Sequence, residues 1–303
     1  MRKAIQYEYG GPEVLRIIEV DRPEPGPGEV LVRVRAASVN FGETKLRTGV
    51  AKAGPLPFTL GSDLSGTVES TGQGATRFRP GDEVYGVHFI GTYAEYVAVP
   101  ETALAPKPGE LDHVRAAALP VAGLTALAAV AEAGCAPGQR VLIHAGAGGV
   151  GHLAVQLAKE RGAFVLVTAR AAKHAFLRDL GADEVIDYTT TDFTRAASAV
   201  DVVFDLVGGA YGPRSLDSLR PGGLLLSAAL DPGLDESEAE KRGIRYKWVT
   251  LRATGAELEK ITALVRQGHL SPHVERTFPL ADVAAAHRAA DSGRVTGKLV
   301  ITL

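Results

Sequence analysis

A glycine-rich turn near the middle of the chain limits the possible folds more than any other segment. The apolar stretch Arg140–Ala145 runs directly into GAGGVG, and apolar side chains then recur at helical spacing. A strand, a G-x-G-x-x-G turn and a helix in this order are typical of a dinucleotide-binding βαβ unit. In such a unit the first glycine makes a tight turn, the second lets the backbone approach a pyrophosphate, and the third lets the helix pack closely. We therefore expect a pyrophosphate site at Gly146, Ala147, Gly148, Gly149, Val150 and Gly151; the alternative is a structural turn that binds no ligand.

The pattern of strands and helices changes twice along the chain, which predicts two domains. Short strands separated by glycine and proline turns fill the first hundred residues, as in the alternating stretch Glu29–Val39. From about Pro120, apolar strands alternate with helical stretches, and this predicts a doubly wound parallel sheet with right-handed crossovers. Near Leu270 the pattern of the first hundred residues returns. We expect a β-rich domain of residues 1–119, completed by 270–303, and a nucleotide-fold domain of residues 120–269.

Composition excludes several classes of partner. The chain has 303 residues, of which 33 are basic and 35 acidic, so its net charge of −2 does not favour a nucleic acid or an acidic membrane. The uncharged stretch between Arg115 and Glu132 contains Pro120 and Gly123 and is too short to span a bilayer, so we interpret it as a buried helix. The single cysteine, Cys135, and the absence of a signal-peptide core predict a cytoplasmic protein without disulfides.

The residues after the second nucleotide-fold strand indicate which dinucleotide binds. Sites that prefer NAD carry Asp or Glu about 20 residues beyond the glycines, where the acid bonds the ribose 2′-hydroxyl. Here no acid occurs between Arg161 and Asp179, and Arg170 and Lys173 stand in its place. Two cations without a carboxylate favour the 2′-phosphate of NADP(H). The alternative is that both cations are merely solvated at a helix start.

Several further segments carry a family resemblance. These are ASVNFGETKLRTG, LPFTLGSDLSGTV, GTYAEYVAVP, ALPVAGLTAL, VLIHAGAGGVGHLAVQLAK, LGADEVIDY, DVVFDLVG and GKLVI. In order and spacing they resemble the zinc-independent quinone oxidoreductases of the medium-chain dehydrogenase/reductase superfamily, across essentially the whole chain. The resemblance implies an α/β fold class in which a Rossmann doubly wound parallel sheet is inserted in a GroES-like, mostly β catalytic domain.

The same segments differ from the zinc alcohol dehydrogenases of that superfamily. Those relatives place a cysteine where this chain has Asn40, and Gly-His-Glu where it has Gly61-Ser62-Asp63. A catalytic zinc takes about three protein ligands from Cys, His or carboxylate groups. The cysteine-rich lobe that holds structural zinc in those relatives is also missing. We therefore expect no metal.

The resemblance implies two catalytic residues in the first domain. Asn40 would lie near the nicotinamide or the acceptor, and Asp63 would orient its neighbours. Each has an alternative, because Asn40 followed by Glu43 can cap a helix and Asp63 can hydrogen-bond within its glycine-flanked turn. Other candidates for the acceptor side are His88, Phe89, Trp248 and Arg47.

The resemblance also implies further cofactor contacts. Thr125 would help to hold the cofactor from the helix before the nucleotide fold, and Tyr188 would lie at the 2′-phosphate. Ala169, directly before Arg170, is a further cofactor-binding candidate. Alternatively, a helical threonine bonds its own backbone and a strand-end tyrosine is amphipathic surface. Val207 and Gly208 would pass beside the nicotinamide ribose. Lys298 would stand at the mouth of the cleft, or would be a solvated strand lysine.

These features predict an NADPH-dependent oxidoreductase that transfers hydride to quinones or related α,β-unsaturated carbonyls. A 2-enoyl-thioester reductase is one alternative, although those relatives carry a tyrosine after the glycine that corresponds to Gly49, and the stretch GVAKAGPLPF has none. A non-catalytic NADPH-binding sensor or scaffold is another. The resemblance further implies a homodimer joined through the edge strand around Tyr246–Leu251.

Overall fold

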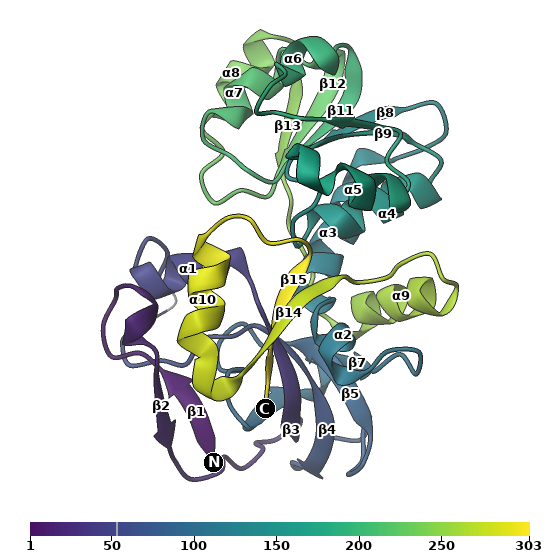
Figure 1. Ribbon diagram of the computed structural model, residues 1–303. Helices are drawn as coiled ribbons and strands as arrows, with labels where there is room; N and C mark the ends of the chain where they lie inside the picture. The colour runs from purple at the N-terminus through teal and green to yellow at the C-terminus, as the bar shows by residue number, and fades with distance from the viewer. Residues whose placement is uncertain (53) are drawn as a thin grey trace. The chain divides into compact units, whose positions relative to one another are not determined.

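The computed structural model describes residues 1–52 and 54–303, which form two compact units (Figure 1). Unit 1 contains Met1–Leu124 and Arg252–Leu303, and unit 2 contains Thr125–Leu251. Unit 2 is thus inserted in the sequence of unit 1. This arrangement, with a parallel sheet in one unit and a mostly antiparallel sheet in the other, confirms the predicted fold class.

The six strands of unit 2 form one parallel sheet in the order β10-β9-β8-β11-β12-β13. Their bounds are β8 (Arg140–Ile143), β9 (Phe164–Thr168), β10 (Glu184–Ile186), β11 (Val200–Asp205), β12 (Leu219–Ser227) and β13 (Arg245–Trp248). Numbered within the unit, this is the order 3-2-1-4-5-6 of a Rossmann fold. The order reverses between β8 and β11, and an open α/β sheet binds its ligand at the carboxyl ends of the strands beside such a reversal.

The central strands of this sheet are apolar and pack around a shared core. Leu142, Leu166, Val203 and Leu225 are fully buried on adjacent strands and form its core with Phe193. The helices are α3 (Pro120–Ala133), α4 (Gly151–Glu160), α5 (His174–Asp179), α6 (Phe193–Ala196), α7 (Tyr211–Ser215) and α8 (Glu236–Lys241), with the 3₁₀ turn η3 (Ala171–Lys173) before α5. Helix α3 begins in unit 1 and ends in unit 2.

Unit 1 is built on a seven-stranded sheet in the order β14-β15-β3-β4-β5-β7, with β6 also paired to β3. The bounds are β3 (Glu29–Val39), β4 (Asp63–Thr71), β5 (Glu83–Val87), β6 (Tyr96–Pro100), β7 (Leu104–Pro106), β14 (Val274–Pro279) and β15 (Lys298–Thr302). The short strands β1 (Arg2–Ile5) and β2 (Arg16–Glu19) pair with each other. Because β15 pairs with β3, the last strand of the chain lies in the same sheet as strands from the first hundred residues.

The remaining elements of unit 1 surround that sheet. They are α1 (Phe41–Thr48), α2 (His113–Ala117), α9 (Gly255–Arg266), α10 (Val283–Asp291) and the 3₁₀ turns η1 (Pro12–Val14), η2 (Glu101–Ala103) and η4 (Leu280–Asp282). Tyr85 on β5 donates its hydroxyl hydrogen to the carbonyl oxygen of Leu258 at 2.6 Å. Helix α9 therefore groups with unit 1 by its contacts, whereas the boundary expected near 269/270 assigns it to the nucleotide-fold domain.

Among residues 1–52 and 54–303, none of the helices combines the length and the apolar character that a membrane span requires.

Candidate active site

The glycine-rich turn joins the end of β8 to the start of α4. A Cβ atom added to Gly146 would lie 1.9 Å from Val167 Cγ1, and one added to Gly151 would lie 2.4 Å from the carbonyl oxygen of Ala145. The protein's own packing therefore requires both glycines. A Cβ atom on Gly148 would approach, of the described atoms, only the Ala145 oxygen, at 3.2 Å. Because one side of Gly148 is open, its backbone can be approached closely, which fits the pyrophosphate of a dinucleotide.

A second turn lies across the strand-order reversal, at the end of β11. Asp205 accepts hydrogen bonds from the backbone N–H groups of Val207 and Gly208 through one carboxylate oxygen, both at 2.9 Å. Gly208 has a φ of 76°, and a Cβ atom there would lie 2.0 Å from the carbonyl oxygen of Asp231. Burial raises the pKa of Asp205. These contacts hold Val207 and Gly208 at the carboxyl edge, at the strand next to the one that carries the glycine turn.

Arg170 and Tyr188 meet beyond the ends of β9 and β10. Arg170 Nε donates a hydrogen bond to the Tyr188 hydroxyl oxygen at 3.0 Å, and this bond raises the pKa of the guanidinium. Lys173 lies in η3, within one turn of Arg170. The structure adds an acid that the sequence spacing missed, because Asp187 follows β10 and accepts the N–H of Ala171 at 3.1 Å. Asp187 reaches this position because β10 pairs with β9, and the sequence spacing alone does not reveal that pairing.

The other predicted cofactor residues of unit 2 are buried. Ala169 directly follows β9, and its N–H donates to the carbonyl oxygen of Ile186 at 3.0 Å. Thr125 lies in α3 with its side chain buried. Their contact with a cofactor stays a prediction.

In unit 1, Asn40 is the centre of a buried polar cluster. Its Oδ1 accepts a hydrogen bond from Lys298 Nζ at 2.5 Å. Its Nδ2 donates to Asp63 Oδ2 at 2.9 Å and to Glu43 Oε1 at 3.2 Å. An ammonium can only donate and a carboxylate, when ionised, can only accept, so these partners define which way the amide points. Both hydrogens of the Asn40 amide are therefore engaged within the protein.

Asp63 connects this cluster to three other segments. Besides Asn40, its carboxylate accepts the hydroxyl of Ser38 on β3 and, at 2.7 Å, the backbone N–H of Val121 on α3. Lys298 Nζ lies 3.6 Å from the same carboxylate, and the two side chains are 3% and 0% exposed, respectively. The alternative that Asp63 bonds only within its own turn is therefore wrong. So is the alternative that Lys298 is a solvated strand lysine.

Glu43 extends the cluster toward α10. Its carboxylate accepts the backbone N–H of Asn40 at 3.0 Å, as in a helix-capping box, and also the hydroxyl hydrogen of Tyr93. His287 Nε2 lies 3.3 Å from the Tyr93 hydroxyl oxygen. Burial raises the pKa of both Glu43 and Tyr93, and it lowers the pKa of His287 to about 3, so the imidazole is neutral.

The sequence reasoning missed Ser38, Tyr93 and His287 as members of this cluster. The signal for Tyr93 was present, because it lies in the segment GTYAEYVAVP, but nothing local pairs it with Glu43 fifty positions away. Of the acceptor-side candidates, Arg47 is 2% exposed and paired with Asp291 at 2.8 Å, which is a structural role. Phe89 in unit 1 and Trp248 in unit 2 are exposed. The His88 side chain is partly buried, and this burial lowers its pKa.

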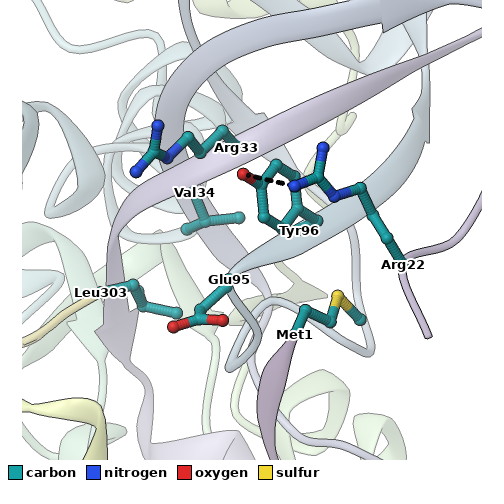
Figure 2. Close-up of a pocket in the computed structure, with 7 residues that line it drawn as sticks. All are labelled: Met1, Arg22, Arg33, Val34, Glu95, Tyr96 and Leu303. Carbon is teal, nitrogen blue, oxygen red and sulfur yellow. Dashed lines mark hydrogen bonds between the residues drawn. The ribbon is translucent and has the colours of Figure 1, made fainter. Parts of the chain in front are cut away.

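Two other features of the described chain were candidates for a site, namely a metal-binding group and a surface hollow in unit 1. Among residues 1–52 and 54–303, no three His, Cys, Asp or Glu side chains are grouped so that they could hold a metal ion. The hollow whose lining residues are drawn in Figure 2 lies in unit 1. Its volume is about 330 Å³, and it shares no lining residue with the Asn40 cluster. There Arg22 lies 3.9 Å above the Tyr96 ring and pairs with Glu69, and Glu95 pairs with Arg2, so the charges compensate one another.

Comparison with known proteins agrees with this geometry. Residues 26–109 match a family model described as an alcohol dehydrogenase GroES-like domain, and residues 180–301 match one described as a zinc-binding dehydrogenase. A quinone oxidoreductase of Pseudomonas aeruginosa is 35% identical over 99% of both chains. The solved quinone oxidoreductase of Coxiella burnetii is 37% identical, with a TM-score of 0.95 over 100% of this chain and 99% of that one. The Escherichia coli quinone oxidoreductase, solved in complex with NADPH, is 28% identical, with a TM-score of 0.94 over the whole of both chains.

The fold of each unit, with unit 2 inserted in the sequence of unit 1, defines a medium-chain dehydrogenase/reductase. Within that superfamily the chain belongs to the zinc-independent quinone oxidoreductase family, as its motifs predicted. The "zinc-binding" description belongs to the family model; at the positions where zinc relatives place ligands, this chain has Asn40, Ser62 and Asp63.

The Asn40 cluster generates the first testable prediction. Asn40→Ala removes the amide that joins Lys298 to two buried carboxylates, which should lower the free energy of unfolding by at least about 1–3 kcal/mol. Ser38→Ala is the matched control, because it removes only one hydrogen bond to the same Asp63 carboxylate and should cost about 0.5–1.5 kcal/mol. Both are measured by urea unfolding. Equal stabilities for Asn40→Ala and the wild type would show that the amide does not hold the cluster together.

Proposed function

We propose that this chain binds NADP(H) at the carboxyl edge of the β8–β11 sheet and reduces quinones or related α,β-unsaturated carbonyls. The observation that carries the proposal is the conjunction, on one Rossmann edge, of the open Gly148 backbone with the Arg170–Tyr188 pair. Related proteins support it. The Escherichia coli relative was solved with NADPH, and an Arabidopsis thaliana relative, 33% identical over 99% of this chain and 79% of its own, is an NADPH-dependent alkenal/one oxidoreductase.

The residues of unit 2 divide the recognition of the cofactor. The glycine turn and the start of α4 hold the pyrophosphate, because the helix presents its positive dipole end there and the turn lets an anion approach the backbone closely. Arg170, Lys173 and Tyr188 hold the 2′-phosphate, since a guanidinium, an ammonium and a hydroxyl all donate to phosphate oxygens. Val207 and Gly208 contribute the ribose-facing segment. When bound, NADPH supplies the hydride.

Asn40 and Asp63 are the residues that we place on the acceptor side. Because both amide hydrogens of Asn40 are bonded to carboxylates, its role is to present a fixed surface rather than to donate a proton. A quinone needs no dedicated acid, because the oxygens that gain electrons take their protons from water. Lys298 acts through both residues, because it donates a hydrogen bond to Asn40 and compensates the negative charge of Asp63.

The two alternative functions have no observation in their favour. A 2-enoyl-thioester reductase and a non-catalytic NADPH-binding sensor both remain outcomes of the assay below, but none of the relatives named above supports them over quinone or enone reduction.

We also propose a homodimer and a cytoplasmic location. Strand β13 pairs with β12 on one side and lies at the edge of the sheet, and its Trp248 is 44% exposed, so a second copy would cover the open strand edge and this aromatic side chain. A reducing compartment suits the single cysteine, whose thiol pKa burial raises to about 11.

The purified chain should consume NADPH when it is offered a simple quinone or an enone. The assay follows the loss of nicotinamide absorbance, with a 2-enoyl thioester offered in parallel. Turnover confined to the thioester would establish the reductase alternative. NADPH binding without turnover of any acceptor would establish the sensor alternative.

Arg170→Ala should weaken NADPH binding much more than NADH binding. A charge-assisted bond to phosphate contributes about 1.5–3 kcal/mol, which corresponds to a roughly ten- to hundredfold loss for NADPH alone. Dissociation constants from fluorescence titration check this. Arg178→Ala, an exposed arginine in the last turn of α5, is the control and should change neither constant. Equal losses for both cofactors would remove Arg170 from the 2′-phosphate site.

One chain has a mass of 31.7 kDa, and light scattering should give twice this mass. Replacing the exposed edge tryptophan, Trp248→Asp, places a charge on the proposed contact and should shift the mass toward that of one chain. A mass of one chain for the wild type, at concentrations well above those of the assay, would contradict the dimer.

A further inference from the structure

We propose that Tyr211, held in place by the buried His144, is a positioning residue for the Arg170–Tyr188 pair and thereby sets the preference for a 2′-phosphate. The inference rests on the proposed NADP(H) binding and adds residues that do not touch the phosphate. It is carried by a continuous series of contacts within unit 2.

The first contact leaves Arg170 ready to bind an anion. Arg170 is an exposed, flexible side chain, and its Nε is bonded to the Tyr188 hydroxyl oxygen at 3.0 Å. Among the described residues, no other group bonds the remaining guanidinium nitrogens. The Nε bond therefore restricts the side chain while it leaves the terminal nitrogens available as a fork for a phosphate.

Tyr188 can hold Arg170 only if its own ring is held, and the structure provides a neighbour. Tyr188 is 38% exposed, and its ring meets that of Tyr211 edge to face, with centroids 6.5 Å apart and an interplanar angle of 77°. Tyr211 is in turn stacked on Phe193 at 5.3 Å and 12°. The guanidinium of Arg214 lies 4.5 Å from the centroid of the Phe193 ring. These rings join α6 and α7 to the segment that follows β10.

His144 fixes the other side of Tyr211. Its ring meets Tyr211 edge to face at 5.0 Å and 80°, and its Nε2 lies 3.1 Å from Ser215 Oγ. Ser215 donates its one hydroxyl hydrogen to the carbonyl oxygen of Tyr211 at 2.7 Å. Ser215 must therefore accept from His144, so the proton is on Nε2.

The opposite ring nitrogen completes the assignment. His144 Nδ1 lies 3.0 Å from Thr168 Oγ1, and because Nδ1 carries no proton it accepts the threonine hydrogen. Burial lowers the pKa of His144 to about 3, so the ring is neutral. The neutral ring has one tautomer here, with the proton on Nε2, and therefore one pattern of hydrogen bonds. One imidazole thus ties the end of β8 to the end of β9 and to α7.

The consequence is preorganisation of the phosphate site. Tyr211 holds the Tyr188 ring, and Tyr188 holds Arg170. Without Tyr211, both side chains would have to become ordered when the ligand binds. Ordering of a flexible side chain on binding costs about 0.5–1.5 kcal/mol, so a roughly two- to tenfold loss is expected for a ligand with a 2′-phosphate. A ligand without that phosphate does not use Arg170 and should be unaffected.

Two adenosine fragments test this without turnover. Calorimetric titration with adenosine 2′,5′-bisphosphate and with AMP measures the contribution of the 2′-phosphate directly. Tyr211→Leu should weaken the bisphosphate roughly fivefold and leave AMP unchanged. Tyr211→Phe should bind both like the wild type, because the ring and not the hydroxyl makes the contacts. His144→Leu should resemble Tyr211→Leu, and His144→Gln, which keeps a donor for Ser215, should restore part of the loss.

Tyr9→Leu is the matched control, because the Tyr9 ring also packs against another aromatic ring, that of Phe58, with centroids 6.5 Å apart, but Tyr9 lies in unit 1 and outside the Asn40 cluster. It should change neither affinity. If Tyr211→Leu fails to fold by circular dichroism, Tyr211→Met, which is also unringed, replaces it. If the Tyr211 and His144 variants keep the wild-type ratio of the two affinities, or lose affinity equally for both ligands, this inference is wrong and the proposed NADP(H) binding is unaffected. A wild type that does not prefer the bisphosphate would overturn the proposed NADP(H) binding as well.

Discussion

The close approach of Gly151 to the carbonyl oxygen of Ala145 is the contact on which the nucleotide unit depends. A side chain at Gly151 would lie 2.4 Å from that oxygen, so only glycine lets α4 begin directly against the end of β8. Ala145 itself adopts a left-handed φ of 51°, at a cost of about 1–2 kcal/mol that the packing of the turn must offset. Because the helix starts there, its positive dipole end is located at the strand-order reversal. The anion site is thus a consequence of backbone packing rather than of any one polar side chain.

Unit 1 solves a different problem, which is to hold charged groups out of water. Asp63 and Glu43 are buried, and the buried ammonium of Lys298 lies 3.6 Å from the Asp63 carboxylate. Isolated buried charges are strongly unfavourable, and such groups persist only when they are paired and hydrogen-bonded. Asn40 meets this condition, since its amide accepts from the cation and donates to both carboxylates. The same bonds join β3, β4, α1 and β15, so the polar cluster also connects segments from the two ends of the chain.

The sequence predicted what local pattern determines and missed what long-range pairing determines. The glycine spacing, the alternation of strand and helix, and the return to the first domain were all readable, because each depends on neighbours within a few residues. The burial of Lys298 was not, because it depends on β15 pairing with β3 across most of the chain. Likewise Asp187 lies near Arg170 only because β10 pairs with β9. Ser38, Tyr93 and His287 were missed for the same reason.

Cofactor preference shows how far the local pattern extends. The absence of an acid after β9 and the presence of Arg170 are properties of a short segment, and they suffice to favour a phosphate over a hydroxyl. They do not make an exposed arginine rigid. Arg170 is held by its hydrogen bond to Tyr188, which follows β10. The Tyr188 ring in turn contacts that of Tyr211, which lies in α7 after β11. A preference that can be attributed to one residue in the sequence is therefore distributed, in the structure, over the ends of three strands, with His144 at the end of a fourth.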